Sequence, residues 1–181
     1  MKKTELLAPA GSFEKAKVAF MYGADAVYCG TATLSLRSRA EVDDNDLEKT
    51  IKYAHSIGKK VYAALNIYAW DTNYEEIEKQ VKMLDEVHVD AIIASDGGVI
   101  QKIREIAPNI EIHVSTQANV VSYHAAKFWY DNGAKRVILG RETSKDQIQE
   151  IMKNKPEDLE VEMFIHGALC WAYSGRCFLS E

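Results

Sequence analysis

Two cysteines and a histidine near the end of the chain are the residues whose types most directly suggest chemistry. Cys170 and Cys177 flank a Gly-Arg turn, and His166 lies four residues before the first cysteine. Thiolates and imidazole bind zinc, and thiolates also bind iron–sulfur clusters. Two thiolates complete neither site, and the His166 spacing matches no standard zinc motif. Spacing alone favours two buried structural cysteines, with a three-ligand zinc site as the alternative.

Nucleophilic catalysis has weaker support. Cys170 and His166 are close enough in sequence to form a thiolate pair, but no third group that would orient the histidine is evident. The sequence contains neither G-x-S-x-G nor H-E-x-x-H. Serine-hydrolase and zincin chemistry therefore lack motif support.

A second group of polar residues follows the apolar runs along the chain, where the strands of an α/β fold present their ligand-binding ends. Serine at such a position is also an ordinary helix N-cap, which is the favoured interpretation of Ser12 and Ser95. Gln117 and Asn119 are less easily explained as caps. The other members of the group are Asn66, Asp96, Ser115, Thr116, Arg141, Glu142 and His166. Arg141 and Glu142 form either part of a site or a local ion pair.

A basic loop follows the second apolar run. Arg37 and Arg39 lie there among small polar residues. Two guanidinium groups in such a loop could hold a carboxylate or a phosphate through paired hydrogen bonds. A solvated loop is the alternative.

Seven apolar runs predict strands, and amphipathic stretches between them predict helices. The strand candidates are residues 5–10, 26–30, 60–66, 91–95, 111–116, 136–140 and 159–167. Several are almost continuously apolar, as in parallel strands buried on both faces. Capping-box patterns at Thr72 and Thr143 predict helix starts, and Gly23, Gly58 and Gly133 predict helix ends.

This alternation of strand and helix predicts an α/β fold with a parallel sheet. No G-x-G-x-x-G follows the first strand, so an open dinucleotide-binding sheet loses its best evidence. A TIM-barrel-like arrangement is favoured. A complete (β/α)₈ barrel needs eight strands and typically about 250 residues. With seven strands in 181 residues, we expect residues 1–181 to be one barrel domain cut short after the seventh strand.

Composition limits the class of protein. Apolar residues make up 47% and charged residues 27%, which excludes a disordered, collagen-like or disulfide-stapled chain. The net charge of −5 argues against a protein that coats nucleic acids generally. No run reaches the ~18 apolar residues of a membrane span, and the N-terminal apolar stretch is too short for a signal peptide. Three cysteines, an odd number, predict a reducing cytoplasm.

Longer motifs carry a specific resemblance. They are ELLAPAGS, YGADAVYCG, LRSR, GKKVYAALN, VSTQANV and KFWYDNGAKRVILGRE, followed by Glu162, Phe164, Gly167, Ala168, Cys170, Gly175, Cys177 and Ser180. Over essentially its whole length the chain resembles the U32 family of collagenase-like peptidases. It looks most like the branch that hydroxylates uridine at the tRNA wobble position without oxygen, using prephenate as hydroxyl source.

The resemblance implies a TIM-barrel-like catalytic domain with a [4Fe–4S] cluster on four cysteines. Cys170 and Cys177 match the first two, and the other two would lie beyond Glu181. No ligand role passes to Cys29.

The resemblance also implies roles for polar residues. Arg37, Arg39 and Arg141 would clamp a small dicarboxylate such as prephenate, or an RNA phosphate. Asn66 would contact the substrate. Gln117, Asn119 and His166 would orient it or shuttle a proton. Glu162 would be catalytic or paired with an arginine inside the barrel, and the ion pair is favoured.

Three functional hypotheses follow. The first is a tRNA-hydroxylating enzyme with tRNA as partner, and the second is a peptidase, as the family name states. The third is an inactive fragment completed by a partner chain or by a homo-oligomer, because the first and seventh strands would leave open edges.

Overall fold

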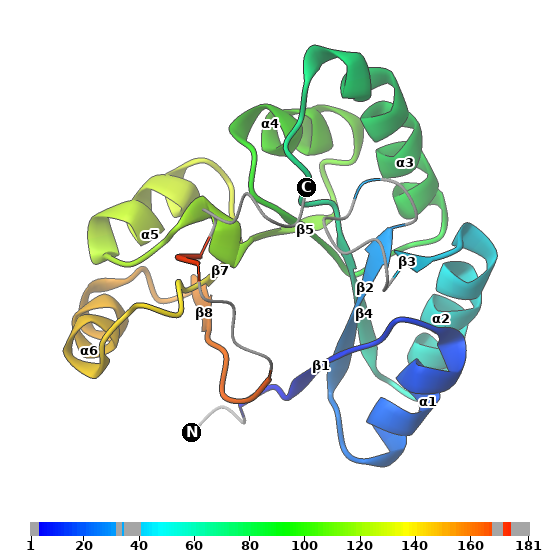
Figure 1. Ribbon diagram of the computed structural model, residues 1–181, viewed down its shortest axis with the longest axis horizontal. Coiled ribbons are helices and arrows are strands. Elements are labelled where there is room, and N and C mark those ends of the chain that lie inside the picture. The colour runs from blue at the N-terminus through cyan, green and yellow to red at the C-terminus, as the bar shows by residue number, and fades with distance from the viewer. Residues whose placement is uncertain (1–3, 32–33, 35–40, 168–171, 175–181) are drawn as a thin grey trace.

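The computed structural model describes residues 4–31, 34, 41–167 and 172–174, and within them seven parallel strands form one curled sheet (Figure 1). These strands are β1 (Leu7–Pro9), β2 (Ala26–Thr31), β4 (Lys60–Ala64), β5 (Ala91–Ala94), β6 (Glu111–Val114), β7 (Arg136–Ile138) and β8 (Glu160–Glu162). Each pairs with the next in that order. Such a sequential order is that of a barrel, whereas a doubly wound sheet reverses direction at a switch point. The predicted barrel-like fold is confirmed as a half-barrel.

Helices cover the outside of the curl, one after most strands (Figure 1). They are α1 (Phe13–Met21), α2 (Asp44–Ser56), α3 (Tyr74–Glu86), α4 (Gly97–Ile106), α5 (Tyr123–Asp131) and α6 (Lys145–Asn154), with the short 3₁₀ helices η1 (Asp71–Asn73) and η2 (Thr116–Ala118). The two-residue strand β3 (Glu41–Val42) pairs with β2 and was not predicted. A run that short carries no periodicity from which to predict it.

Two predicted helix starts were wrong. Helix α6 begins at Ser144, whose Oγ accepts a hydrogen bond from the backbone N–H of Gln147, rather than at Thr143. Helix α3 is preceded by η1, so Thr72 lies inside a 3₁₀ turn and does not cap it. The glycine helix ends are confirmed, because Gly23, Gly58 and Gly133 all have positive φ angles.

Successive side chains along each strand point to opposite faces of the sheet, and apolar side chains are buried on both faces. Val27, Val61 and Val137 face the helices and join the main core there. Tyr62 and Ile93 face the inside of the curl and belong to a second, smaller cluster. This two-residue period explains why the strands read as continuous apolar runs.

The two ends of the sheet approach each other without pairing. Strand β1 pairs with β2, and β8 with β7, and the sheet path ends at these two strands within the described part of the chain. A side-chain contact links the two ends of the sheet instead. Arg136 on β7 donates a 2.8 Å hydrogen bond to Glu5, just before β1. None of the described helices has the length and apolarity needed to span a bilayer.

Candidate functional site

Some of the polar residues that follow the strands are helix caps. The hydroxyl of Ser12 accepts a hydrogen bond from the backbone N–H of Lys15 and begins α1. At the end of β5 the cap is Asp96, which accepts a hydrogen bond from the backbone N–H of Val99, so the predicted cap at Ser95 was wrong by one residue. These contacts account for Ser12 and Asp96 without a functional role.

The loop after β6 holds Gln117 in place. The buried Ser115 hydroxyl donates a 3.1 Å hydrogen bond to Gln117 Oε1 and also accepts one from the Gln117 backbone. Thr116 donates from its hydroxyl to the carbonyl of Leu139, which ties this loop to the end of β7. Gln117 therefore lies on a loop that its neighbours fix on two sides.

Asn119 ends the same loop in an unusual conformation. Its φ and ψ angles are 57° and 44°, the left-handed region that asparagine tolerates better than most residues. Its side-chain Oδ1 is buried and has no hydrogen-bond partner within the described residues. An unpaired buried acceptor costs roughly 1–3 kcal/mol, so a donor from a water or a bound ligand would be favoured there.

Arg141 and Glu142, after β7, hold a distant segment. Glu142 Oε1 accepts a 2.7 Å hydrogen bond from the backbone N–H of Ser174, whose hydroxyl accepts one of 3.2 Å from the backbone of Arg141. The guanidinium donates to the carbonyl of Ala172. Within the described chain no salt bridge joins the two side chains, although burial raises the pKa of Glu142 and hydrogen bonds from Ser174 together with the charge of Arg141 lower it. Instead they anchor residues 172–174, which lie between Cys170 and Cys177 in the sequence.

Gly140 leaves the space that this anchoring needs. A Cβ atom placed on it would lie 2.9 Å from Glu142 Oε2 and 2.9 Å from Val121 Cγ1. Its backbone N–H donates to the carbonyl of Val120, joining the loops after β6 and β7. The segments carrying Gln117, Asn119 and Arg141 are thus joined at the ends of adjacent strands.

The remaining predicted site residues are placed differently. Asn66 is half-buried just beyond β4, and His166 is exposed beyond β8. Within the described residues, no hydrogen bond joins His166 to Gln117, Asn119 or Arg141. Four predicted residues lie outside the described residues: Arg37, Arg39, Cys170 and Cys177.

The sequence predicted only part of a charged cluster inside the curl, since it indicated an arginine partner for Glu162 but not the other members. We call it the floor cluster: Glu5, Tyr62, His113, Arg136, Glu160 and Glu162. Arg136 is its centre, with its guanidinium 2.6 Å from Glu160, 3.2 Å from Glu162 and 5.1 Å from the Tyr62 ring. Alternation in Glu160-Val161-Glu162 puts both carboxylates on one face, which was the available sequence signal.

Charge inside the floor cluster shifts several pKa values. Burial raises the pKa of Glu162, against the lowering effect of Arg136, while Glu5 and Glu160 raise it further. Burial alone would lower the pKa of Arg136, but the carboxylates of Glu5 and Glu160 hold it above its usual value. Glu162 thus points inward and pairs with arginine, the arrangement expected of a structural ion pair.

His113 is fully buried beside this cluster. Neither ring nitrogen has a hydrogen-bond partner in the described part of the molecule, and the nearest carboxylate, Glu111, lies 3.6 Å from Nε2. The ring packs edge-on against Tyr62 at 4.6 Å. Burial lowers the pKa of His113, with Arg136 adding to the effect and Glu111 opposing it. His113 is therefore held as neutral imidazole.

Cys29 faces away from the inside of the curl. It is 1% exposed and packs in the core between the sheet and the helices. Burial raises its pKa to about 12, which disfavours the thiolate that binds metal. In the described ranges no three His, Cys, Asp or Glu side chains gather closely enough to hold a metal ion.

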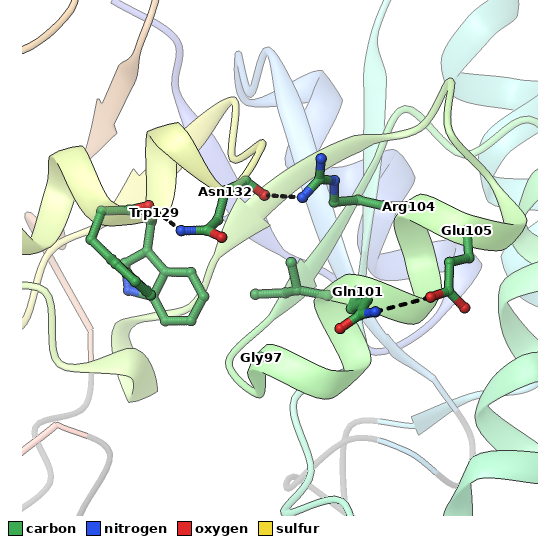
Figure 2. Close-up of a pocket in the computed structure, with 8 residues that line it drawn as sticks. Gly97, Gln101, Arg104, Glu105, Trp129 and Asn132 are labelled. Atoms are coloured by element: carbon green, nitrogen blue, oxygen red, sulfur yellow. Dashed lines mark hydrogen bonds between the residues drawn. The ribbon is translucent and has the colours of Figure 1, made fainter.

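A groove on the outer surface lies between α4 and α5 (Figure 2). It has a volume of about 480 Å³ and is lined by Gly97, Ile100, Gln101, Arg104, Glu105, Phe128, Trp129 and Asn132. The Arg104 guanidinium on α4 donates a hydrogen bond to the carbonyl of Asn132, at the end of α5. Gln101 donates to Glu105 within α4, so these polar groups of the groove already have partners. The groove contains none of the predicted site residues.

A family model and individual relatives assign the chain to the same protein family. The model of peptidase family U32 matches residues 11–181. The tRNA hydroxylation protein P of Haemophilus influenzae is 49% identical over 179 residues, covering 98% of this chain and 39% of that protein. The 23S rRNA 5-hydroxycytidine C2501 synthase of Escherichia coli is 38% identical over 179 residues, covering 99% of this chain and 27% of that protein. The chain thus spans well under half the length of these relatives.

The fold agrees with that family. The solved structure of the U32 peptidase Mk0906 superposes with a TM-score of 0.69 at 15% identity, covering 88% of this chain and 68% of that one. At that identity the likeness concerns the fold, a TIM-barrel type. The family match over nearly all of the chain is the stronger result, and it places this chain in peptidase family U32.

Proposed function

We propose that this chain is the amino-terminal catalytic part of an RNA-modifying enzyme that hydroxylates uridine in the tRNA wobble position to 5-hydroxyuridine. The observation that carries the proposal is the 49% identity, across 98% of this chain, to a tRNA hydroxylation protein. A second relative modifies a pyrimidine of ribosomal RNA by hydroxylation, as its name states. A tRNA substrate fits a cytoplasmic protein.

The joined loops after β6 and β7 are the proposed substrate site. The carboxyl ends of the strands are where TIM-barrel enzymes bind their substrates. Gln117 is fixed there by Ser115, and the unpaired Oδ1 of Asn119 would accept a hydrogen bond from a substrate N–H. His166 is exposed beyond β8 and would reach the same end of the sheet as a proton shuttle.

Arg141 is the proposed anchor of a dicarboxylate co-substrate of the prephenate type. Its guanidinium is half-buried and, within the described residues, has no carboxylate within ion-pair distance. Its remaining N–H groups would hold a carboxylate through two hydrogen bonds. We expect Arg141→Met to weaken co-substrate binding, seen as a raised KM. Arg104→Met, in the outer groove, is the matched control and should leave KM unchanged.

We propose that Cys170 and Cys177 contribute to an iron–sulfur cluster. A [4Fe–4S] cluster takes four thiolates, and Cys29 does not fit, because it faces the helices as a protonated thiol. Cys170 and Cys177 would supply two ligands, and two more would come from outside residues 1–181.

The peptidase alternative has no geometric support in the described residues. No histidine there is hydrogen-bonded to a serine or a cysteine, which a Ser-His or Cys-His protease would require. The buried His113 has no such neighbour among its contacts.

A chimera tests the proposal directly. This chain would replace the matching segment of the H. influenzae tRNA hydroxylation protein P in a bacterial strain lacking that activity. Mass spectrometry of digested tRNA should then show restored 5-hydroxyuridine. Cys170→Ser with Cys177→Ser should abolish both the product and the iron content, whereas Cys29→Ala should preserve both. A folded chimera that restores no hydroxylation would overturn the proposal.

A further inference from the structure

Several described aromatic side chains are exposed beyond the carboxyl ends of the strands, and Trp70 and Tyr173 are more exposed than Phe164 (47%) and Tyr68 (38%). Trp70, in the loop after β4, is 73% exposed, and Tyr173, over the end of β7, is 68% exposed. Single exposed apolar residues are common and need no explanation by themselves. These two differ because the backbone beneath each is fixed by hydrogen bonds while the ring is left in solvent.

The backbone of Trp70 is held by a closed pair of hydrogen bonds. Its N–H donates to Asn73 Oδ1 at 2.9 Å, and the Asn73 N–H donates back to the Trp70 carbonyl at 2.8 Å. The turn continues directly through η1 into α3. The indole is therefore presented from a turn that is already ordered, so little backbone entropy is lost when something stacks on it.

Tyr173 is held on both sides in a different way. The preceding carbonyl, that of Ala172, accepts from the Arg141 guanidinium, and the following residue, Ser174, is bonded to Arg141 and Glu142. Ser174 is 1% exposed while the neighbouring phenol is in solvent. The ring thus stands on an anchored segment beside a guanidinium.

Trp70 follows β4, and the segment that carries Tyr173 is anchored to the loop after β7. Strands β4 and β7 are three places apart in the sheet, with the ends of β5 and β6 between them. At about 4.8 Å per strand, their carboxyl ends lie on the order of 14 Å apart along the sheet. The loop that carries Gln117 and Asn119 follows β6, inside that interval.

We propose that Trp70 and Tyr173 are stacking platforms for unpaired nucleotides on either side of the reacting base. The inference rests on the proposed function and names how the RNA is held. Proteins bind single-stranded RNA by stacking bases on exposed aromatic rings, with cationic groups nearby for phosphate.

A protein partner is the less favoured occupant. The core of a protein interface is a continuous apolar patch, whereas polar residues directly follow both rings in the sequence. Asp71 and Asn73 follow Trp70, and Ser174 follows Tyr173. These polar neighbours favour base stacking over a dry protein contact.

Binding to a defined RNA tests the proposal without requiring catalysis. The probe is a fluorescently labelled RNA hairpin with unpaired uridines in its loop, compared with the fully paired duplex of the same sequence. Fluorescence anisotropy with the 181-residue chain should show preference for the hairpin. Trp70→Ala and Tyr173→Ala should each weaken hairpin binding at least about fivefold, and duplex binding much less. Trp70→Phe and Tyr173→Phe keep a ring and should retain most of the affinity.

Tyr22→Ala is the matched control. Tyr22 is 84% exposed but caps the carboxyl end of α1, at the opposite end of the sheet, and should not affect binding. Equal affinity of wild type and both alanine variants for the hairpin would overturn the inference, as would an equal loss in Tyr22→Ala. A chain that binds no hairpin would overturn it too, and the chimera assay would then judge the proposed function separately. Altered self-association of the alanine variants, with RNA binding unchanged, would assign the rings to a protein contact instead.

Discussion

Arg136 and Glu5 are separated by 131 positions in the chain, yet a 2.8 Å hydrogen bond joins Arg136 Nη1 to Glu5 Oε1. The contact links β7 to the segment before β1, at the place where the sheet is not closed by backbone hydrogen bonds in the described residues. The same guanidinium also bonds Glu160, so one side chain connects both ends of the curl.

Removing that guanidinium should destabilise the fold strongly. Arg136→Met leaves Glu5, Glu160 and Glu162 without their shared partner, and loss of one member of a buried ion pair costs about 3–5 kcal/mol. Urea denaturation followed by circular dichroism would measure the loss. The exposed pair of Lys79 and Glu75 provides the control, because Lys79→Met should change stability little. An Arg136→Met variant as stable as the control variant would contradict this account.

Stability should depend on pH through His113. Its pKa is lowered in the folded protein, so the unfolded chain, with a pKa near 6.5, takes up a proton first. Neutral His113 therefore contributes its full stabilisation above about pH 6.5. This stabilisation is lost as the pH falls toward the lower pKa that His113 has in the folded protein. The loss should approach ~1.4 kcal/mol per pH unit in that window.

His113→Leu isolates this effect. The raised pKa of Glu162 acts in the opposite direction, favouring the fold at low pH, but it is common to both proteins and cancels in the difference. The free energy of unfolding should therefore fall more between pH 8 and pH 5.5 in the wild type than in His113→Leu. His124→Gln, at an exposed position on α5, should follow wild type. Parallel pH dependence of wild type and His113→Leu would count against the assignment.

Glu142 should protect the backbone amide of Ser174. That N–H donates to Glu142 Oε1 at 2.7 Å, so Glu142→Ala frees it to exchange with solvent. Hydrogen exchange measured by NMR should be faster at Ser174, and limited proteolysis near residues 172–174 should increase. Gly140→Ala should act in the same direction, since its Cβ would displace Glu142. Glu157→Ala, at an exposed position, should leave Ser174 unchanged.

Cys29 should be chemically silent in the folded protein. Its thiol is buried with a pKa of about 12, so almost no thiolate exists at pH 8. In a Cys170→Ala, Cys177→Ala protein, an alkylating reagent should modify Cys29 only after denaturant is added, as mass spectrometry would show. Rapid modification without denaturant would place Cys29 on an accessible surface and contradict its orientation.

Sequence predicted the architecture well because each strand carries its own signal. The run at residues 91–95 is apolar on both faces, and the structure forms β5 there. The errors in the predicted helix starts arose where neighbouring residues could each act as the N-cap. Thr143 and Ser144 are both good caps, and the choice of Ser144 depends on Gln147 reaching back to the Ser144 backbone. Such one-residue choices are fixed by side-chain geometry and not by pattern.

The floor cluster was predicted only in part, because an arginine partner was expected for Glu162 but the other members were not. Arg136 begins a strand, and Glu5 precedes another, where charged residues are ordinary. Only the curl of the sheet brings them together, and curl is a property of all the strands jointly. By contrast, the ends of β6 and β7 are adjacent in any sequential barrel, so the proximity of the loops carrying Gln117 and Arg141 followed from the predicted order.

The bond between Arg136 and Glu5 also bears on the order in which the molecule assembles. Each strand and its following helix make contacts between residues close in sequence, which form quickly. Bringing Arg136 to Glu5 closes a loop of 131 positions, which loses chain entropy before any contact is gained. The contact between Arg136 and Glu5 should therefore form last. We expect the same contact to open more readily than the strands that pair through backbone hydrogen bonds.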